Sequence, residues 1–159
     1  MISQSGSSEH CAVGAAKIGA LILVRRTGCL SRVPVISIID DDVSVRVATG
    51  RLVRSLGYLA HTFASADDFL NSSHVNDTWC VIADVQMPGT NGIELQRILS
   101  AKGCPVPIIF ITAFPEESTR MRALKAGAVA FLSKPFGGPI LIECIDNALK
   151  KHRREACES

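Results

Sequence analysis

Apolar and polar positions alternate in blocks along the chain after Val33. Between short apolar runs, apolar residues recur every three or four positions, as on one face of a helix; the first such set is Val45, Ala48, Leu52 and Leu56. The apolar runs, each long enough for one buried strand, lie at 34–39, 58–63, 79–83, 108–111 and 129–132. The pattern predicts five successive strand-helix units.

Local signals place the ends of the intervening helices. The segment Ser65-Ala66-Asp67-Asp68 is typical of a helix start, because a serine side chain can cap free backbone N–H groups. Glu116 and Glu117 favour a second start, since negative charge is stabilised at that end of a helix. Gly57, Gly103 and Gly127 follow apolar periodic segments and favour helix ends. The last helix is predicted from Ile140 to Leu149, running into a basic tail.

The strand runs are apolar throughout and do not alternate with polar residues. Strands of this kind suit a parallel sheet that is buried on both faces, with right-handed crossover helices on each side. We therefore expect an α/β fold: a doubly wound, flavodoxin-like (βα)5 sheet of five parallel strands in the order 2-1-3-4-5.

Composition agrees with one folded domain. The chain has 159 residues, of which 47% are apolar and 20% charged, and the formal net charge is +2. A disordered chain would have fewer apolar residues and a larger net charge. The six cysteines show neither a C-x-x-C spacing nor a histidine at zinc-ligand spacing, so we expect free thiols in a reducing, cytoplasmic compartment.

Both ends of the chain differ from its middle. Residues 1–33 carry four basic side chains and one acidic side chain, and residues 150–159 carry four and two. The apolar stretch 12–24 is too short for a transmembrane helix. A secretory signal has its positive charges before the apolar stretch, whereas here they come after it. We expect a disordered extension at 1–33, a domain at 34–150 and a basic tail at 151–159, without membrane association. Neither basic end contains interleaved aromatic residues, so the sequence does not predict nucleic-acid binding.

Chemically active residues follow four of the predicted strands. Asp40 and Asp41 end the first strand, Asp84 the third, Thr112 the fourth and Lys134 the fifth. Carboxyl ends of parallel strands lie at one edge of a sheet, where ligands bind in open α/β folds, so these side chains can converge.

This set of residues restricts the chemistry. Clustered carboxylates repel each other unless a cation is present, and hard oxygen ligands suit Mg²⁺. One carboxylate can then act as a nucleophile toward phosphorus, with Lys134 and Thr112 contacting phosphoryl oxygens. Each residue also has an ordinary structural explanation. An Asp at a strand end is usually a turn or cap residue, a Thr there is usually a strand residue, and a Lys-Pro is usually a surface turn. The three residues 40–42 could simply form a solvated loop that caps the next helix. Only their combination favours a phosphoryl site.

At this point the chain resembles the response-regulator receiver domains of two-component signalling. The resemblance covers about residues 34–150. It is carried by Ile38-Ile39-Asp40-Asp41-Asp42, Asp84-Val85-Gln86-Met87-Pro88-Gly89-Thr90-Asn91-Gly92, Ile111-Thr112-Ala113, Ala123-Leu124-Lys125-Ala126-Gly127-Ala128 and Lys134-Pro135-Phe136.

The resemblance implies a role for each matched position. Asp84 is expected to accept the phosphoryl group, with Thr112 and Lys134 contacting it. Asp40, Asp41, Asp84 and the backbone carbonyl of Gln86 are expected to form the Mg²⁺ site, Asp41 directly and Asp40 mainly through water.

Two aromatic residues are expected to modify the behaviour of the site. Phe131 matches the aromatic switch position, which turns inward when Thr112 moves; it can also be a plain core residue. Gln86 and Phe114 match positions that tune hydrolysis of the acyl phosphate, and an apolar Phe114 would shield it.

The implied function is a phosphorylation-activated signalling switch that catalyses only its own phosphorylation and dephosphorylation. Its donor would be a sensor histidine kinase or phosphotransfer protein. Its output would be contact with an unidentified downstream protein, or homodimerisation, through the face formed by the helix at 116–126, the strand at 129–132 and the last helix.

Alternatives remain open. Few residues follow Pro135, so a stand-alone receiver is expected, unless the chain is the receiver fragment of a longer regulator; its receiver most resembles those ahead of helix-turn-helix outputs. A Mg²⁺-dependent aspartyl-phosphate phosphatase would need an acid where Gln86 stands. A receiver that only binds partners is disfavoured by the complete set Asp41, Asp84, Thr112 and Lys134.

Overall fold

The computed structural model describes residues 32–158. Nearly all of the predicted extension at 1–33 therefore lies outside the described residues. Five parallel strands form one sheet in the order β2-β1-β3-β4-β5, as predicted. The strands are β1 (Val35–Ile39), β2 (Leu59–Phe63), β3 (Cys80–Asp84), β4 (Ile108–Thr112) and β5 (Ala130–Ser133).

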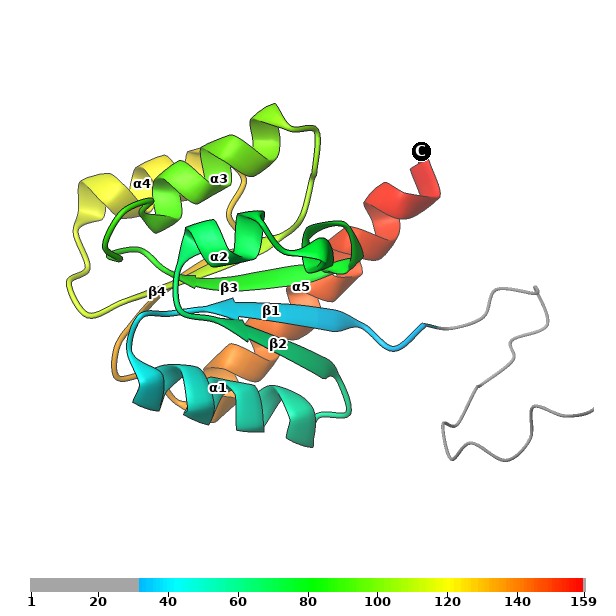
Figure 1. Ribbon diagram of the computed structural model, residues 1–159, viewed down its shortest axis with the longest axis horizontal. Helices are drawn as coiled ribbons and strands as arrows, with labels where there is room; N and C mark the ends of the chain where they lie inside the picture. Colours follow the sequence, from blue (N-terminus) through cyan, green and yellow to red (C-terminus); the bar gives the residue numbers. More distant parts are fainter. Residues whose placement is uncertain (1–31, 159) are drawn as a thin grey trace, which may run out of the picture. The chain divides into compact units, whose positions relative to one another are not determined.

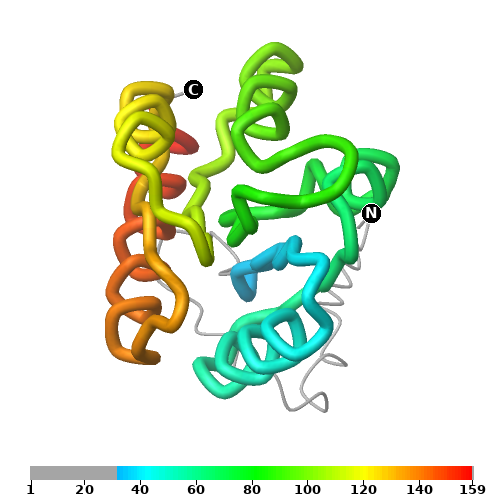
Figure 2. The backbone as a smooth tube through the Cα atoms, turned by 90° about the vertical axis from the view of Figure 1, so that its left-hand side faces the viewer, coloured from blue at the N-terminus to red at the C-terminus, as the bar shows by residue number. Residues whose placement is uncertain are grey.

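Helices cover both faces of this sheet (Figure 1). They are α1 (Val43–Ser55), α2 (Ala66–Leu70), α3 (Gly92–Ala101), α4 (Glu117–Lys125) and α5 (Gly138–Glu158), with a short 3-10 helix η1 (Ser73–Asp77) before β3. Viewed along the strands, α1 and α5 lie on one side of the sheet, while α2, α3 and α4 lie on the other (Figure 2). This is the doubly wound arrangement that the continuous apolar strands predicted.

The three central strands supply the middle of the core. Every residue of β3 and β4 is buried, because helices pack on both faces of these strands. Two apolar clusters result, one per face. On one face, Val53 of α1 and Leu141 of α5 pack over Ile38 and Ile82. On the other face the cluster contains Phe69, Leu95, Leu99, Phe110 and Ala123.

The predicted helix start at Ser65 is confirmed: its side chain accepts a hydrogen bond from the N–H of Asp68, at 3.0 Å. Asp42 caps α1 in the same way, accepting from the N–H groups of Ser44 and Val45. Asp42 thus has the capping function that its position after β1 allowed, and its carboxylate is directed to helix α1.

Two elements differ from the sequence expectation. Helix η1 has no counterpart in the prediction, because residues 73–77 lack apolar periodicity. Helix α5 begins two residues earlier than predicted and continues to Glu158, so the described part of the expected tail is helical. Contacts to the domain hold this extension: Lys151 Nζ donates to Gly127 O at 3.1 Å, and His152 stacks on Trp79 with ring centroids 5.0 Å apart.

Within residues 32–158, none of the helices combines the length and the apolar character that crossing a membrane requires.

Candidate functional site

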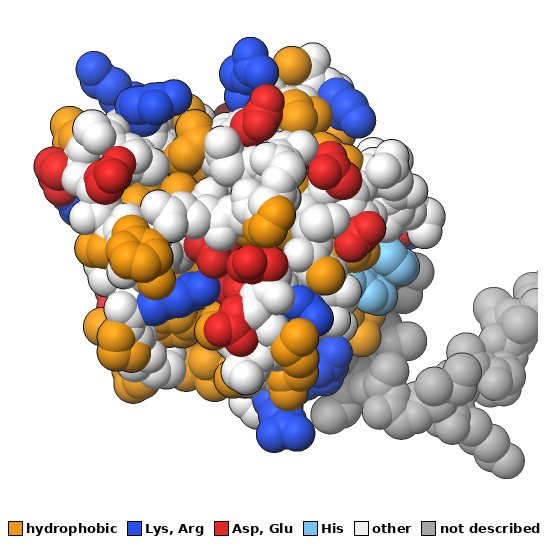
Figure 3. Space-filling view, turned by 60° about the vertical axis from the view of Figure 1, so that its left-hand side comes forward, with side chains coloured by type: hydrophobic (Ala, Val, Ile, Leu, Met, Phe, Trp, Pro, Cys, Tyr) orange, Lys and Arg blue, Asp and Glu red, His pale blue; other side chains and the backbone are white. Residues whose placement is uncertain are grey.

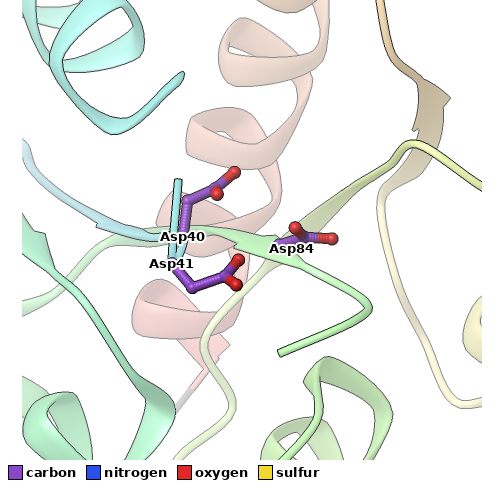
Figure 4. A group of neighbouring side chains, drawn as sticks. All are labelled: Asp40, Asp41 and Asp84. Atoms are coloured by element: carbon purple, nitrogen blue, oxygen red, sulfur yellow. The ribbon is translucent and has the colours of Figure 1, made fainter. Parts of the chain in front are cut away.

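Three carboxylates meet at the carboxyl edge of the sheet. Asp40 and Asp41 directly follow β1, and Asp84 is the last residue of its neighbour β3. One oxygen of each carboxylate lies within 4.8 Å of the others, and the three side chains gather at the ends of these strands (Figure 4). Asp40 is fully buried and Asp84 is 6% exposed, whereas Asp41 is open to solvent. The sequence prediction that these residues converge is therefore confirmed.

Lys134 connects the two buried carboxylates. Its Nζ donates to Asp40 Oδ2 at 2.9 Å and to Asp84 Oδ2 at 3.0 Å. Lys134 directly follows β5, and its backbone N–H donates to the carbonyl of Thr112 at 2.7 Å, while the bond to Pro135 is cis. The lysine thus reaches across β4 to the ends of β1 and β3.

Burial and neighbouring charges have opposite effects on the pKa values of Asp40 and Lys134. Burial raises the pKa of Asp40 above its ordinary value, although hydrogen bonds from Lys134 and from the N–H of Asp42 favour the ionised form. Burial alone would lower the pKa of Lys134, but its hydrogen bonds to Asp40 and Asp84 outweigh that effect, and the pKa is raised. Lys134 is therefore a cation here.

Thr112 ends β4 beside Asp84. Its hydroxyl is fully buried and accepts a hydrogen bond from the N–H of Phe114 at 3.1 Å. The Phe114 side chain itself is 67% exposed, so the loop after β4 presents an aromatic ring to solvent close to the threonine. The threonine and the lysine both reach the carboxylate edge, as the sequence suggested.

The loop after Asp84 is tied to the Asp84 carboxylate. The N–H of Gln86 donates to Asp84 Oδ1 at 3.1 Å, while the Gln86 side chain points into solvent. Met87 is buried, and Thr90 fixes the loop to α2 by donating to Asp67 Oδ1 at 2.9 Å. Gln86 is thus adjacent to the carboxylates; its carbonyl as a metal ligand stays a prediction.

Phe131 lies on β5 directly opposite Phe110 of β4. It is partly buried against the apolar cluster under α3 and α4, and the two ring centroids are 6.3 Å apart. The residue has contacts on the core side and access to solvent on the other. Its role as a switch stays a prediction.

Two supporting residues were missed from the sequence. Gly92, the first residue of α3, packs so closely beneath Asp84 that a Cβ atom would lie 2.5 Å from the Asp84 carbonyl oxygen. Arg46 donates from Nη1 to the Asp40 carbonyl at 2.6 Å, which fixes the strand end. Gly92 stands in the motif that follows Asp84, but only the fold reveals the close contact.

The donor set fits a small divalent cation. All three side chains offer hard oxygen ligands, and one of them is open to solvent, which suits a hydrated ion such as Mg²⁺. With Lys134 protonated and the carboxylates ionised, the formal charge of the four side chains is −2, which a divalent cation balances.

Comparison with known proteins gives one family. The model of the response regulator receiver domain matches residues 36–146. The response regulator protein TodT of Pseudomonas putida is 43% identical over 119 residues, covering 75% of this chain and 52% of TodT. The transcriptional regulatory protein FixJ of Bradyrhizobium diazoefficiens is 36% identical over 116 residues, covering 73% of this chain and 57% of FixJ.

Solved structures agree with the sequence relatives. The response regulator StyR has a TM-score of 0.73 and 40% identity, covering 80% of this chain and 65% of the StyR chain. A response regulator receiver protein from Burkholderia phymatum has a TM-score of 0.65 and 46% identity. The match covers 74% of this chain and 95% of the Burkholderia chain. The chain spans about half the length of the curated relatives it matches. With the fold and the edge residues described above, the chain belongs to the response regulator receiver domain family, the phosphorylation-activated switches of two-component signalling.

Proposed function

We propose that Asp84 accepts a phosphoryl group from a phosphohistidine of a sensor histidine kinase or phosphotransfer protein, with Mg²⁺ bound by Asp40, Asp41, Asp84 and the carbonyl of Gln86. The observation that carries this proposal is the Lys134 ammonium bonded to Asp40 and Asp84 beside the exposed Asp41. Asp84 is 6% exposed, so only a small part of it is open to a phosphoryl donor.

In the transfer, an Asp84 oxygen forms a bond to phosphorus while the phosphorus–nitrogen bond of the donor breaks. The electron pair of that bond passes to the imidazole nitrogen of the donor. Mg²⁺, when bound, supplies positive charge against the phosphoryl oxygens. Lys134 exchanges its bond to Asp84 Oδ2 for one to a phosphoryl oxygen, which keeps the ammonium paired throughout.

The change is proposed to spread through Thr112. Its hydroxyl can donate to another phosphoryl oxygen once it leaves the N–H of Phe114. That movement opens space toward Phe131, whose inward turn would alter the face formed by α4, β5 and α5. A downstream protein or a second copy of the chain would read this face.

The same site would catalyse removal of its own phosphoryl group by water, which makes the domain a self-resetting switch rather than an enzyme acting on other substrates. Relatives named transcriptional regulatory proteins, FixJ and TdiR, support transcription as the final output in the cytoplasm. By the same likeness, the chain is proposed to be the receiver part of a regulator whose other part contacts DNA.

Incubation of the protein with acetyl phosphate tests the proposal. We expect a mass gain of one phosphoryl group that requires Mg²⁺, is prevented by a chelator and is reversed by hydroxylamine, which cleaves acyl phosphates. A mass gain that persists in hydroxylamine would place the phosphoryl group on another type of side chain. Absence of any gain would favour a domain that only binds partners.

A further inference from the structure

A groove runs along α3 on the side that faces α4. Its larger part, about 1460 Å³, extends from the loop after Asp84 to the end of α4. A smaller hollow of about 320 Å³ continues toward the start of β4. Both parts are lined by Gln96, Ser100 and Ala126, so they adjoin one another along α3. The groove has the length of the ten-residue helix α3, about 15 Å.

A buried amide lies where the two parts meet. Gln96 is 6% exposed, and its Nε2 donates to the carbonyl of Ala123 at 3.2 Å. This bond fixes the orientation of the amide, and its Oε1 has no hydrogen-bond partner among the described residues. This oxygen is itself buried, so a ligand N–H group reaches it only after a small shift of the groove lining. Because an unpaired buried acceptor is costly, that contact would be favourable.

Four basic residues (Arg97, Arg122, Lys125 and Lys151) and two acidic residues (Glu94 and Glu155) line the groove, so its charge is basic on balance. Arg97 of α3 pairs with Glu94 at 3.7 Å. Arg122 and Lys125 of α4 line the opposite side, and within residues 32–158 no ion pair is found for either. Figure 3 shows basic side chains at the top of the molecule on both sides of a hollow. The charge therefore complements an acidic ligand.

Apolar groups line the same groove. Met87 and Pro88 stand at the end near Asp84, and Ile93 of α3 follows them. Ile93 is partly buried against the apolar cluster, so part of it faces the groove. Together, the lining offers apolar contacts, one acceptor and two cations, Arg122 and Lys125, for which residues 32–158 give no ion pair or acceptor partner.

We propose that the groove between α3 and α4 binds an acidic amphipathic segment of a partner protein. Carboxylates of that segment pair with Arg122 and Lys125, its apolar side chains contact Met87 and Ile93, and one of its N–H groups donates to Gln96 Oε1. This surface shares α4 with the face of α4, β5 and α5, but its other wall is α3. The proposal does not depend on phosphorylation of Asp84.

The test uses a fluorescently labelled peptide of about ten residues, which as a helix of about 15 Å matches the length of the groove. The peptide carries leucines on one face and glutamates on the other, and a second peptide has lysines in place of the glutamates. The full chain is titrated with each, by anisotropy and by ¹⁵N-resolved NMR. We expect the glutamate peptide alone to bind and to shift the Gln96 side-chain amide signal.

Two variants and one control locate the binding surface. Reversing both rim charges (Arg122→Glu with Lys125→Glu) is expected to weaken binding about tenfold or more, because attraction becomes repulsion. Gln96→Leu keeps the volume but removes the acceptor and is expected to weaken binding about fivefold. The matched control, Lys150→Glu with Arg154→Glu on α5, reverses two exposed charges outside the groove and should leave binding unchanged.

Three results would overturn the proposal. One is equal binding of both peptides, and another is equal loss of binding in the groove variant and the control. The third is self-association without peptide that the groove variant abolishes, since a second copy of the chain would then be the occupant.

Discussion

At the scale of the residue, Lys134 holds together carboxylates that would otherwise repel each other. Because its ammonium bonds to buried Asp40 and to Asp84, Lys134→Ala leaves two close carboxylates without a counter-charge. We expect the free energy of unfolding to fall by about 2 kcal/mol in metal-free buffer. Urea unfolding with a chelator measures this loss.

The same variant also tests where Mg²⁺ binds. Without the competing lysine charge, Mg²⁺ should stabilise Lys134→Ala more than the wild-type chain, in melts with and without the ion. Equal stabilisation of both chains would mean that the ion binds away from Asp40 and Asp84.

Gly92 shows how a residue without a side chain shapes the site. A Cβ there would overlap the Asp84 carbonyl oxygen, so Gly92→Ala must displace the end of β3. We expect a loss of about 2 kcal/mol in unfolding free energy and less phosphorylation of the chain. Chemical denaturation and acetyl phosphate labelling measure the two effects.

The matched control is Gly50→Ala in α1, where the nearest atom to an added Cβ is the flexible end of Arg54, at 3.2 Å. Alanine there should stabilise the chain by about 0.5 kcal/mol, because it favours the helix. If both glycine variants gave the same change, the close contact at Gly92 would not matter.

Phe114 lies two residues after Thr112, its N–H donates to the Thr112 hydroxyl, and the residue is exposed to solvent. An apolar ring there is expected to limit the approach of water to a phosphoryl group on Asp84. Phe114→Ala should therefore shorten the lifetime of the phosphorylated chain severalfold, measured as loss of label from purified phosphoprotein. The control is Met121→Ala, because Met121 is also an exposed apolar residue but lies on α4. An unchanged or longer lifetime in Phe114→Ala would contradict this role.

At the scale of the element, helix α1 begins within the site but should not take part in its chemistry. Asp42 caps this helix with its side chain, while Asp40 and Asp41 belong to the carboxylate cluster with Asp84. We expect Asp42→Ala to cost about 1 kcal/mol of stability by loss of the cap. Phosphorylation by acetyl phosphate should stay near the wild-type level; a strong decrease would place Asp42 among the functional carboxylates.

Sequence patterns predicted elements well where burial determines the residue type. The apolar runs at β1, β3 and β4 correspond to strands that are buried on both faces, so composition and position agree. The end of α5 could not be predicted in this way. Residues 150–158 contain good helix formers, yet no apolar periodicity, and their helix is held by contacts of Lys151 and His152 to distant residues. A local sequence pattern cannot reveal contacts between residues that are far apart in the chain.

At the scale of the whole molecule, the site is a product of topology. Asp40, Asp84, Thr112 and Lys134 are far apart in sequence and meet because β1, β3, β4 and β5 are neighbours in a parallel sheet. The strand order was predictable, so the meeting point was too. The close contact of Gly92 and the unpaired Gln96 amide were not, because each depends on side-chain and backbone distances between elements.

The central claim is that Asp84 is the phosphoryl acceptor. Its most direct test compares intact masses after incubation with acetyl phosphate and Mg²⁺ for the wild-type chain, Asp84→Asn and Asp68→Asn. Asp68 is an exposed aspartate on α2 outside the carboxylate cluster. We predict the mass gain of one phosphoryl group in the wild type and in Asp68→Asn, and none in Asp84→Asn. An undiminished, hydroxylamine-labile gain in Asp84→Asn would contradict the claim.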